Sequence, residues 1–157
     1  MVLEKMSEKR RSELLDYFVE RFGVPLKAFQ TLDFLESDKG KVFACTRAAA
    51  QATRWVERVA FTGLPFARAS NGFKPSTAAL QLVGGMASCN VLELGEAAAK
   101  KFAAGEDLAS GEFDASRVTP GFVAVSFKGL VLGCGLLKNN GLHSNVPKAK
   151  RSLVSFS

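Results

Sequence analysis

The chain has 157 residues, of which 47% are hydrophobic and 23% charged, a balance typical of a folded globular protein and not of a disordered one. This length allows one ordinary domain or two small domains that share an interface. No apolar run approaches the roughly 20 residues that a membrane-spanning helix needs, and the first residues are charged throughout. We therefore expect a cytoplasmic protein with no signal peptide and no membrane contact.

The net charge of +6 is distributed unevenly along the chain. Residues 1–64 contain 11 basic and 9 acidic residues, and residues 65–114 contain 4 basic and 6 acidic residues. Residues 115–157 contain six basic residues and no acidic one, since Asp114 is the last carboxylate of the chain. An acid-free basic tract predicts a polyanionic partner such as nucleic acid, the alternative being a basic surface that is merely solvated.

Three widely spaced cysteines, Cys45, Cys89 and Cys134, accompany the single histidine, His143. This set lacks a C-x-x-C pair and cannot supply the usual ligands of a zinc ion, so we expect no metal site. We expect all three cysteines to be reduced, buried and packed as small hydrophobic side chains.

The N-terminal part of the sequence predicts a helix, a hairpin and a second helix. Residues 7–22 carry apolar side chains at helical spacing, with Ser7 as N-cap and Gly23 as the C-terminal stop. Residues 31–46 alternate around a turn at 37–40, which is typical of a β-hairpin. Residues 47–60 return to helical spacing, and a break at Gly63 and Pro65 places a subdomain boundary near residue 62.

The remaining sequence mixes strands and helices without regular βαβ alternation. The predicted strands are 64–69, 91–94, 122–127 and 130–137, and the predicted helices are 76–87 and 95–104. Turns are predicted at Lys128-Gly129 and at 139–141. The fold class is therefore α+β: an N-terminal α/β subdomain over 1–62, followed over 63–157 by a small mixed β-barrel.

Two glycine-containing segments, 91–95 and 131–135, are similar to cofactor-binding loops that follow a strand. The first continues with Glu96 in place of a further glycine, and the second leaves only 22 residues before the end of the sequence. His143 has no acidic residue near it in the sequence to orient it as a base, although a partner from earlier in the chain remains open. We therefore predict no catalytic residue, no cofactor and no enzyme.

The functional hypothesis centres on residues 120–151, where two apolar strands and a turn are followed by a basic stretch. Lysine and arginine pair with phosphates, while asparagine and histidine reach sugar hydroxyls and base edges. Gly133 and Gly135 remove side chains from a strand, which indicates either close backbone approach or a bend at a barrel corner. The predicted phosphate contacts are Lys74, Lys138, Lys148, Lys150 and Arg151, and the predicted sugar or base contacts are Asn139 and His143.

The order of short motifs over residues 64–151 resembles the C-terminal PUA-like domain of the Sun/Nop family of RNA cytosine-5 methyltransferases. The matching residues are Gly72-Phe73-Lys74-Pro75, Gln81, Gly105-Glu106-Asp107-Leu108, Pro120-Gly121-Phe122-Val123, Leu132-Gly133-Cys134-Gly135, Lys138-Asn139 and Pro147-Lys148. A looser similarity, at 21–25, is to the stretch that precedes this domain. The resemblance implies a mixed β pseudo-barrel that grips structured RNA through a groove between its first helix and the barrel.

The family's catalytic domain has no counterpart in this sequence, so the resemblance implies a free-standing PUA-like domain behind a pre-PUA-like subdomain, without methyltransferase activity. The lead hypothesis is a non-catalytic protein that binds structured rRNA or tRNA in ribosome biogenesis or RNA modification. The alternative is an adaptor that recruits RNA to a separate RNA-modifying enzyme or ribosome assembly factor. In that case the first helix and the side formed by Arg47, Arg54 and Arg58 provide the docking surface. A small enzyme with an unrecognised site is the third possibility.

Overall fold

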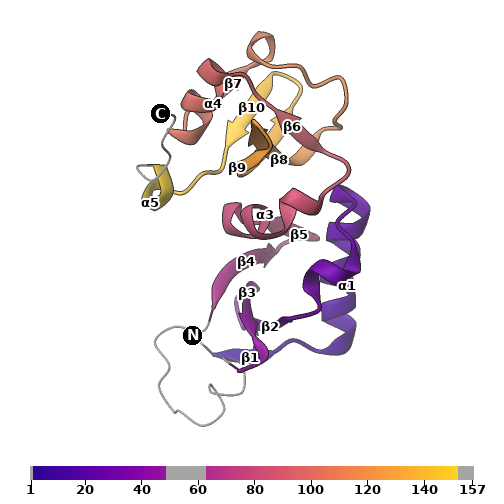
Figure 1. Cartoon of the computed structure of the whole chain (residues 1–157). Coiled ribbons are helices and arrows are strands. Elements are labelled where there is room, and N and C mark those ends of the chain that lie inside the picture. Colours follow the sequence, from indigo (N-terminus) through magenta and orange to yellow (C-terminus); the bar gives the residue numbers. More distant parts are fainter. Residues whose placement is uncertain (1, 49–62, 152–157) are drawn as a thin grey trace.

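The computed structural model describes residues 2–48 and 63–151, which form two five-stranded sheets arranged one after the other with helix α3 between them (Figure 1). The first sheet is antiparallel with strand order β1-β2-β3-β4-β5. Its strands are β1 (Leu3–Lys5), β2 (Leu32–Ser37), β3 (Lys41–Thr46), β4 (Leu64–Ala69) and β5 (Phe73–Pro75). Helix α1 (Glu8–Phe22) covers one face, and a 3-10 turn, η1 (Leu26–Phe29), leads from it into β2.

The second sheet has the order β6-β8-β9-β10-β7, with β6 parallel to β8 and the other pairs antiparallel. Its strands are β6 (Val91–Glu93), β7 (Leu108–Ala109), β8 (Gly121–Phe127), β9 (Leu130–Lys138) and β10 (Gly141–Ser144). The helical segments are α3 (Thr77–Val83), η2 (Gly84–Met86), α4 (Glu96–Ala103), η3 (Ser110–Glu112) and α5 (Lys148–Arg151). The predicted α+β class is confirmed.

Helix α1 forms as its sequence predicts. The Ser7 hydroxyl accepts a hydrogen bond from the Arg10 backbone N–H at 3.2 Å, which caps the start of the helix. Gly23 ends the helix in the left-handed conformation, at a φ of 64° that costs glycine little. Leu14, Phe18 and Phe22 recur every four residues and are fully buried, so one face of α1 joins the core.

Phenylalanine rings dominate the core beneath the first sheet. Phe66 of β4 lies 5.0 Å from Phe18 and 5.1 Å from Phe34, measured between ring centroids. The same apolar cluster continues into Ala124 of β8 and Cys134 of β9, on the second sheet. The two sheets therefore share one core and are not joined merely by a linker. A second apolar cluster, around Phe102, lies between α4 and the second sheet.

Helix α3 is hydrogen-bonded to both sheets. At its N-terminus the Ser76 hydroxyl donates to the Pro65 carbonyl at 2.6 Å. On the other side the Thr77 hydroxyl accepts from the Cys134 N–H at 3.0 Å and lies 3.2 Å from the Asn145 carbonyl, to which it can donate. Because a buried backbone group without a partner is costly, these bonds fix the distance between β4 and β9.

Arg21 near the end of α1 forms a second link between the two halves. Its Nε donates to the Phe122 carbonyl at 2.8 Å, its Nη2 to the Thr119 carbonyl at 2.8 Å and its Nη1 to the Thr119 hydroxyl at 2.6 Å. Asn90 closes the arrangement, because its amide donates to the Arg21 carbonyl and accepts from the Thr119 N–H. We call Arg21, Asn90, Thr119 and Phe122 the interdomain clamp.

The strand pairing divides the chain later than the boundary predicted near residue 62. Strands β4 and β5, which the sequence analysis groups with the C-terminal part, complete the first sheet, because β4 pairs with β3 and β5 pairs with β4. The second sheet starts at β6, after α3. Four short strands, β1, β5, β7 and β10, were not predicted. Of the predicted helix 47–60, Arg47 and Ala48 are helical and the other residues lie outside the described part.

Two further expectations can be compared with the structure. Cys45 and Cys134 are buried and all three cysteines are free, but Cys89 is exposed, so the prediction of burial is wrong for that residue. Its thiol lies at the surface because the segment after η2 crosses the end of α1, where its Sγ is 3.4 Å from the Arg21 carbonyl. Among the described residues, every helix is too short or too polar to cross a lipid bilayer.

Gly133 and Gly135 are explained by close packing inside the protein. A Cβ on Gly133 would lie 2.9 Å from the Thr77 hydroxyl and 3.0 Å from a methyl group of Val146. A Cβ on Gly135 would lie 2.8 Å from Leu142 and 3.0 Å from Val125. These distances are shorter than ordinary contacts of a methyl group, so of the two predicted roles close approach applies to both positions.

Replacing Gly133 by Ala should therefore destabilise the protein. The new methyl group must displace Thr77 or Val146, and overpacking of this kind costs about 1–3 kcal/mol of the free energy of unfolding. Gly85→Ala is the control, since nothing lies within 4 Å of a Cβ there. Denaturant unfolding of both variants measures the difference, and equal stabilities would show that β9 is free to move away from α3.

The interdomain clamp predicts that Arg21→Met lowers stability by roughly 1–2 kcal/mol, because charge-assisted hydrogen bonds are lost, one of them to the partly buried Phe122 carbonyl. Lys9→Met, on the exposed side of the same helix, is the matched control and should have little effect. Thermal unfolding reports the difference. If the two variants melt at the same temperature, the clamp contributes nothing to stability.

Candidate nucleic-acid interface

Helix α5, which holds three of the predicted RNA contacts, packs against the turn that follows α4. The Arg151 Nε donates to the Val146 carbonyl at 3.1 Å, and its guanidinium lies over Gly105. Gly105 has a φ of 87°, and any side chain there would collide with that guanidinium. A glycine is therefore required at this position for two reasons: it adopts the positive φ, and it leaves room for the Arg151 guanidinium.

Asp107, two residues further on, binds β10. Its Oδ1 accepts from the Ser144 N–H at 3.2 Å and lies 2.8 Å from Nδ1 of His143. The Ser144 hydroxyl donates to the Phe102 carbonyl near the end of α4 at 2.8 Å. His143 thus has an acidic partner supplied from earlier in the chain, and its ring is held in place while 52% of the side chain remains exposed.

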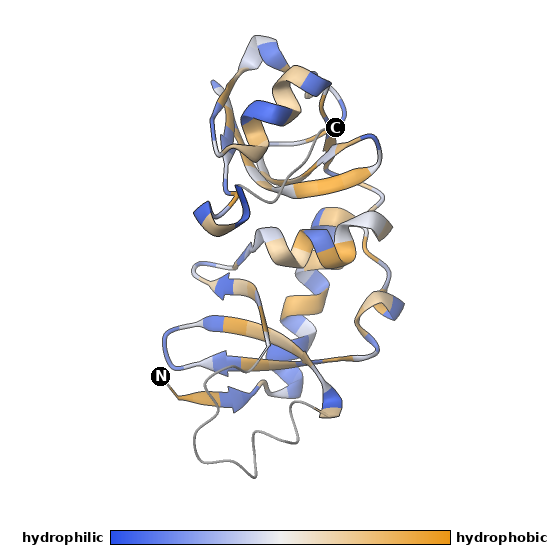
Figure 2. Ribbon diagram, turned by 60° about the vertical axis from the view of Figure 1, so that its left-hand side comes forward, coloured by the Kyte–Doolittle hydropathy of each residue, from blue (hydrophilic) through white to orange (hydrophobic). Residues whose placement is uncertain are grey.

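Lys150 and Lys148 are held differently. The Lys150 Nζ donates to the Gln81 Oε1 on α3 at 2.8 Å, and Gln81 Nε2 donates in turn to the Leu132 carbonyl. Lys148 is exposed, and within residues 2–48 and 63–151 its side chain has no ion-pair partner. Figure 2 shows the hydrophilic colour of α5 at the margin of the apolar second sheet. The helix therefore presents three cations and no carboxylate among the described residues.

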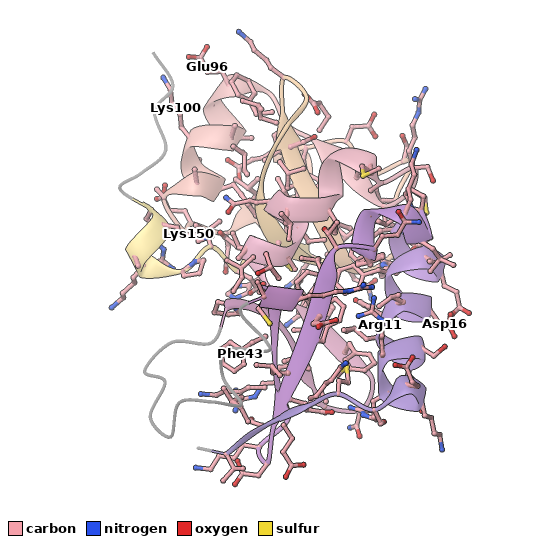
Figure 3. The ribbon with its side chains drawn as sticks, turned by 60° about the horizontal axis from the view of Figure 1, so that its bottom comes forward. Arg11, Asp16, Phe43, Glu96, Lys100 and Lys150 are labelled. Carbon is pink, nitrogen blue, oxygen red and sulfur yellow. The ribbon has the colours of Figure 1, made fainter. Side chains whose placement is uncertain are left out.

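Helix α4 carries two lysines, Lys100 and Lys101, and Figure 3 shows Lys100 on the same side of the view as Lys150 of α5. Lys100 forms an ion pair with Glu96 at 3.3 Å, and Lys101 with Glu112 at 2.6 Å. Sequence reasoning did not propose these lysines, although the four-residue spacing of Glu96 and Lys100 indicates a shared helix face. Both lysines already form ion pairs with carboxylates, so α5 is the stronger candidate for binding an anion.

Lys138, the last residue of β9, and Asn139, in the turn that follows, lie at the opposite end of β10. Lys138 is paired with Gly141 at the start of β10, whereas Ser144 at its end is paired with Gly135. Three residues of strand separate the two ends by about 10 Å, and both side chains of the turn are exposed. The exposed turn therefore precedes β10 directly, and α5 follows the other end of β10 after three residues.

Lys74, the remaining predicted contact, lies in β5 of the first sheet, opposite Arg68 of β4. The structure thus brings four of the seven predicted residues to one end of β10 and two to its other end, and it places Lys74 elsewhere. We call the six residues of the second sheet and its helix the C-terminal basic surface. They are Lys138, Asn139, His143, Lys148, Lys150 and Arg151.

Comparisons with known proteins identify the second half of the chain. Residues 89–152 match the family model described as the Methyltransferase RsmF PUA domain. The C-terminal part is a PUA-like domain. The resemblance found in the sequence motifs is confirmed, and the PUA-like domain contains the second sheet, α4, α5 and the C-terminal basic surface.

The other comparisons concern the N-terminal part and the whole chain. Residues 4–59 match a second model, described as a Family of unknown function (DUF7122). The structure titled "Structure of a Conserved PUA Domain Protein from Thermoplasma acidophilum" is similar with a TM-score of 0.62. The match covers 98% of this chain and 100% of that one at 14% sequence identity, which shows a common fold. No curated protein matches the chain.

The ion pair of Lys101 with Glu112 gives a prediction about pH. The pKa of Glu112 lies below its ordinary value, because Lys101 donates to its carboxylate and the Ala109 N–H donates to the other oxygen. A depressed folded-state pKa contributes stability above the unfolded pKa, and this is lost as the pH falls through the folded value. The contribution is small, since both groups are exposed.

Replacing Lys101 by Met should raise the pKa of Glu112 toward its usual range, while Lys100→Met should leave it unchanged, because Lys100 pairs with Glu96. Carboxyl carbon NMR shifts followed between about pH 2 and 7 measure this directly. An equal Glu112 pKa in both variants would mean that Lys101 does not pair with Glu112 in solution.

Proposed function

We propose that this protein binds RNA through the C-terminal basic surface. The observation that carries the proposal is the contrast between α4 and α5. The lysines of α4 are paired with Glu96 and Glu112, while Lys148, Lys150 and Arg151 have no carboxylate partner among the described residues. Cations of this kind on a rigid support are suited to phosphate oxygens, and phosphate contacts supply most of the affinity in nucleic-acid binding.

The geometry supports separate roles for the residues of this surface. Lys148, Lys150 and Arg151 would contact phosphates, with Arg151 pre-positioned by Gly105 and Val146. His143, held by Asp107, and Asn139, in its exposed turn, would reach sugar hydroxyls or base edges. Lys138, at the other end of β10, would contact a different phosphate of the same RNA, about 10 Å along the strand from the first group.

The class of RNA we propose is structured rRNA or tRNA, in the cytoplasm, in ribosome biogenesis or RNA modification. The support is the rigid union of the two sheets through a shared core and the interdomain clamp, which suits an RNA of fixed shape. We further propose that the protein acts by binding and not by catalysis. Burial raises the pKa of the Cys134 thiol to about 12, so this sulfur stays protonated and is a poor nucleophile.

A second candidate function is recruitment of RNA to a separate modifying enzyme. The matched family model carries the name of a methyltransferase, RsmF, and its PUA domain is the part found here. The exposed side of α1 and Arg47 would serve as the docking surface, together with Arg54 and Arg58, which lie outside the described residues. Recovery of one stable protein partner after nuclease treatment would favour this function.

Replacement of Lys148, Lys150 and Arg151 together by Ala tests the main proposal. At physiological salt we expect affinity for unfractionated tRNA to fall at least ~10-fold. The slope of log affinity against log salt should flatten by about 3, because each phosphate contact that is lost means about one counterion fewer released on binding. Fluorescence anisotropy over a salt series measures both quantities.

The control is a charge-matched triple variant, Lys9→Ala, Lys27→Ala and Lys128→Ala, at exposed positions that are not among the six residues of this surface. It lowers the net charge equally, so an equal loss of affinity would show that overall charge, and not the C-terminal basic surface, attracts RNA. Wild-type affinity in the first variant, with its melting temperature intact, would refute the proposed site.

A further inference from the structure

A row of three basic residues crosses the first sheet. Lys41 of β3 is paired with Arg68 of β4, and Arg68 with Lys74 of β5. All three side chains are exposed. Since neighbouring strands lie about 4.8 Å apart, the row spans roughly 10 Å, a length that two or three consecutive phosphates of one strand can follow.

These side chains point away from α1. Val42 and Ala67, the residues next to Lys41 and Arg68, are buried in the core that packs against α1. Because successive side chains of a strand point to opposite faces, Lys41 and Arg68 lie on the other face, which we call the outer face. Lys74 joins them through its register with Arg68.

Within the described part of the chain, no carboxylate forms an ion pair with any residue of this row. Like charges directly opposite each other on neighbouring strands are destabilising, yet none of the three cations has an ion-pair partner among residues 2–48 and 63–151. Across Lys41 on β2 stands Ser37, whose hydroxyl accepts from the Lys41 backbone N–H at 3.0 Å. A polyanion would supply the missing negative charge.

An aromatic ring lies beside this row on the same face. Phe43 is two residues from Lys41, is partly exposed and is labelled in Figure 3. Its neighbours across the sheet are Pro65 and Leu35, and Leu35 is itself buried in a small apolar cluster with Cys45, so the ring stands at the edge of the open part of this face. Basic side chains next to an aromatic ring are the combination that binds single-stranded nucleic acid, since phosphates meet the cations while a base stacks on the ring.

We infer that the outer face of the first sheet is a second RNA-binding surface, which takes a single-stranded segment. Its phosphates contact Lys41, Arg68 and Lys74, and one base stacks on Phe43. The inference rests on the proposed function, because it assumes that RNA is the partner. It goes further by giving the N-terminal half a binding role of its own and by assigning Lys74 to this surface.

The test uses the full chain and two probes, a fluorescent oligouridine of about twelve nucleotides and unfractionated tRNA. In the triple variant Lys41→Ala, Arg68→Ala and Lys74→Ala, we expect oligouridine affinity to fall ~10-fold or more and the salt slope to flatten by about 2. Phe43→Leu, which keeps an apolar side chain without the ring, should weaken oligouridine binding about fivefold. The Lys9, Lys27 and Lys128 triple variant is again the charge-matched control.

The outcomes separate this inference from the proposed function. If the Lys41, Arg68 and Lys74 variant binds both probes like the wild type while the Lys148, Lys150 and Arg151 variant loses tRNA, the second surface is overturned and the proposed function stands. If the wild-type protein binds neither probe, both fail. If the outer-face variant loses oligouridine while the C-terminal variant retains it, the second surface is supported.

Stability provides the check on folding. Since the alanine variant relieves repulsion between opposed cations, it should melt at the same temperature as the wild type or higher. If it melts earlier, the single exchange Lys74→Glu on the short edge strand β5 takes its place. This variant should weaken oligouridine binding, and unchanged affinity would overturn the inference.

Discussion

The contact between the Arg21 guanidinium and the backbone of residues 119 and 122 is the interaction on which the relation of the two sheets depends. It acts together with a core in which Phe18 and Phe66 of the first half pack in one cluster with Ala124 of the second. Inter-domain contacts within a chain are often polar and permit motion. Here charge-assisted hydrogen bonds and buried apolar area coincide, so we expect the halves to behave as one unit.

A fixed relation between the sheets has a consequence for binding. The two proposed surfaces, held on one rigid body, would engage one RNA at an effective concentration set by geometry, without the entropy that a flexible linker would lose. The fixed spacing also restricts which RNAs bind tightly, because an RNA whose segments do not match it can contact only one of the two surfaces. Rigidity of this kind suits structured RNA, in which single-stranded and helical parts have defined positions.

The sequence predicted those elements whose signals are local. Helix α1 has its cap at Ser7 and its stop at Gly23, and β8 and β9 are apolar runs around a two-residue turn. The short strands carry no such signal, since two to four residues acquire strand geometry only from a neighbour. The boundary predicted near residue 62 follows the local interruption at Gly63 and Pro65, whereas the pairing of β4 with β3 is a tertiary contact that no local pattern reveals. The residue types of the candidate RNA-binding site could be predicted from the sequence. The sequence could not show that Lys74 lies on the first sheet, apart from α5.

The difference between local sequence signals and tertiary contacts also decides which basic residues can bind an anion. A sequence counts charges, whereas a structure shows which of them are already neutralised. Lys101 already donates a hydrogen bond to the Glu112 carboxylate at 2.6 Å, so part of its charge is balanced before an anion binds. Within the described part of the chain, Lys150 donates to the neutral amide oxygen of Gln81 and to no carboxylate, so its charge remains available. Since binding an anion must replace whatever partner a cation already has, the basic residues held by neutral groups provide the larger net gain. That ordering of the cations follows from hydrogen-bond partners alone, and it places α5 ahead of α4.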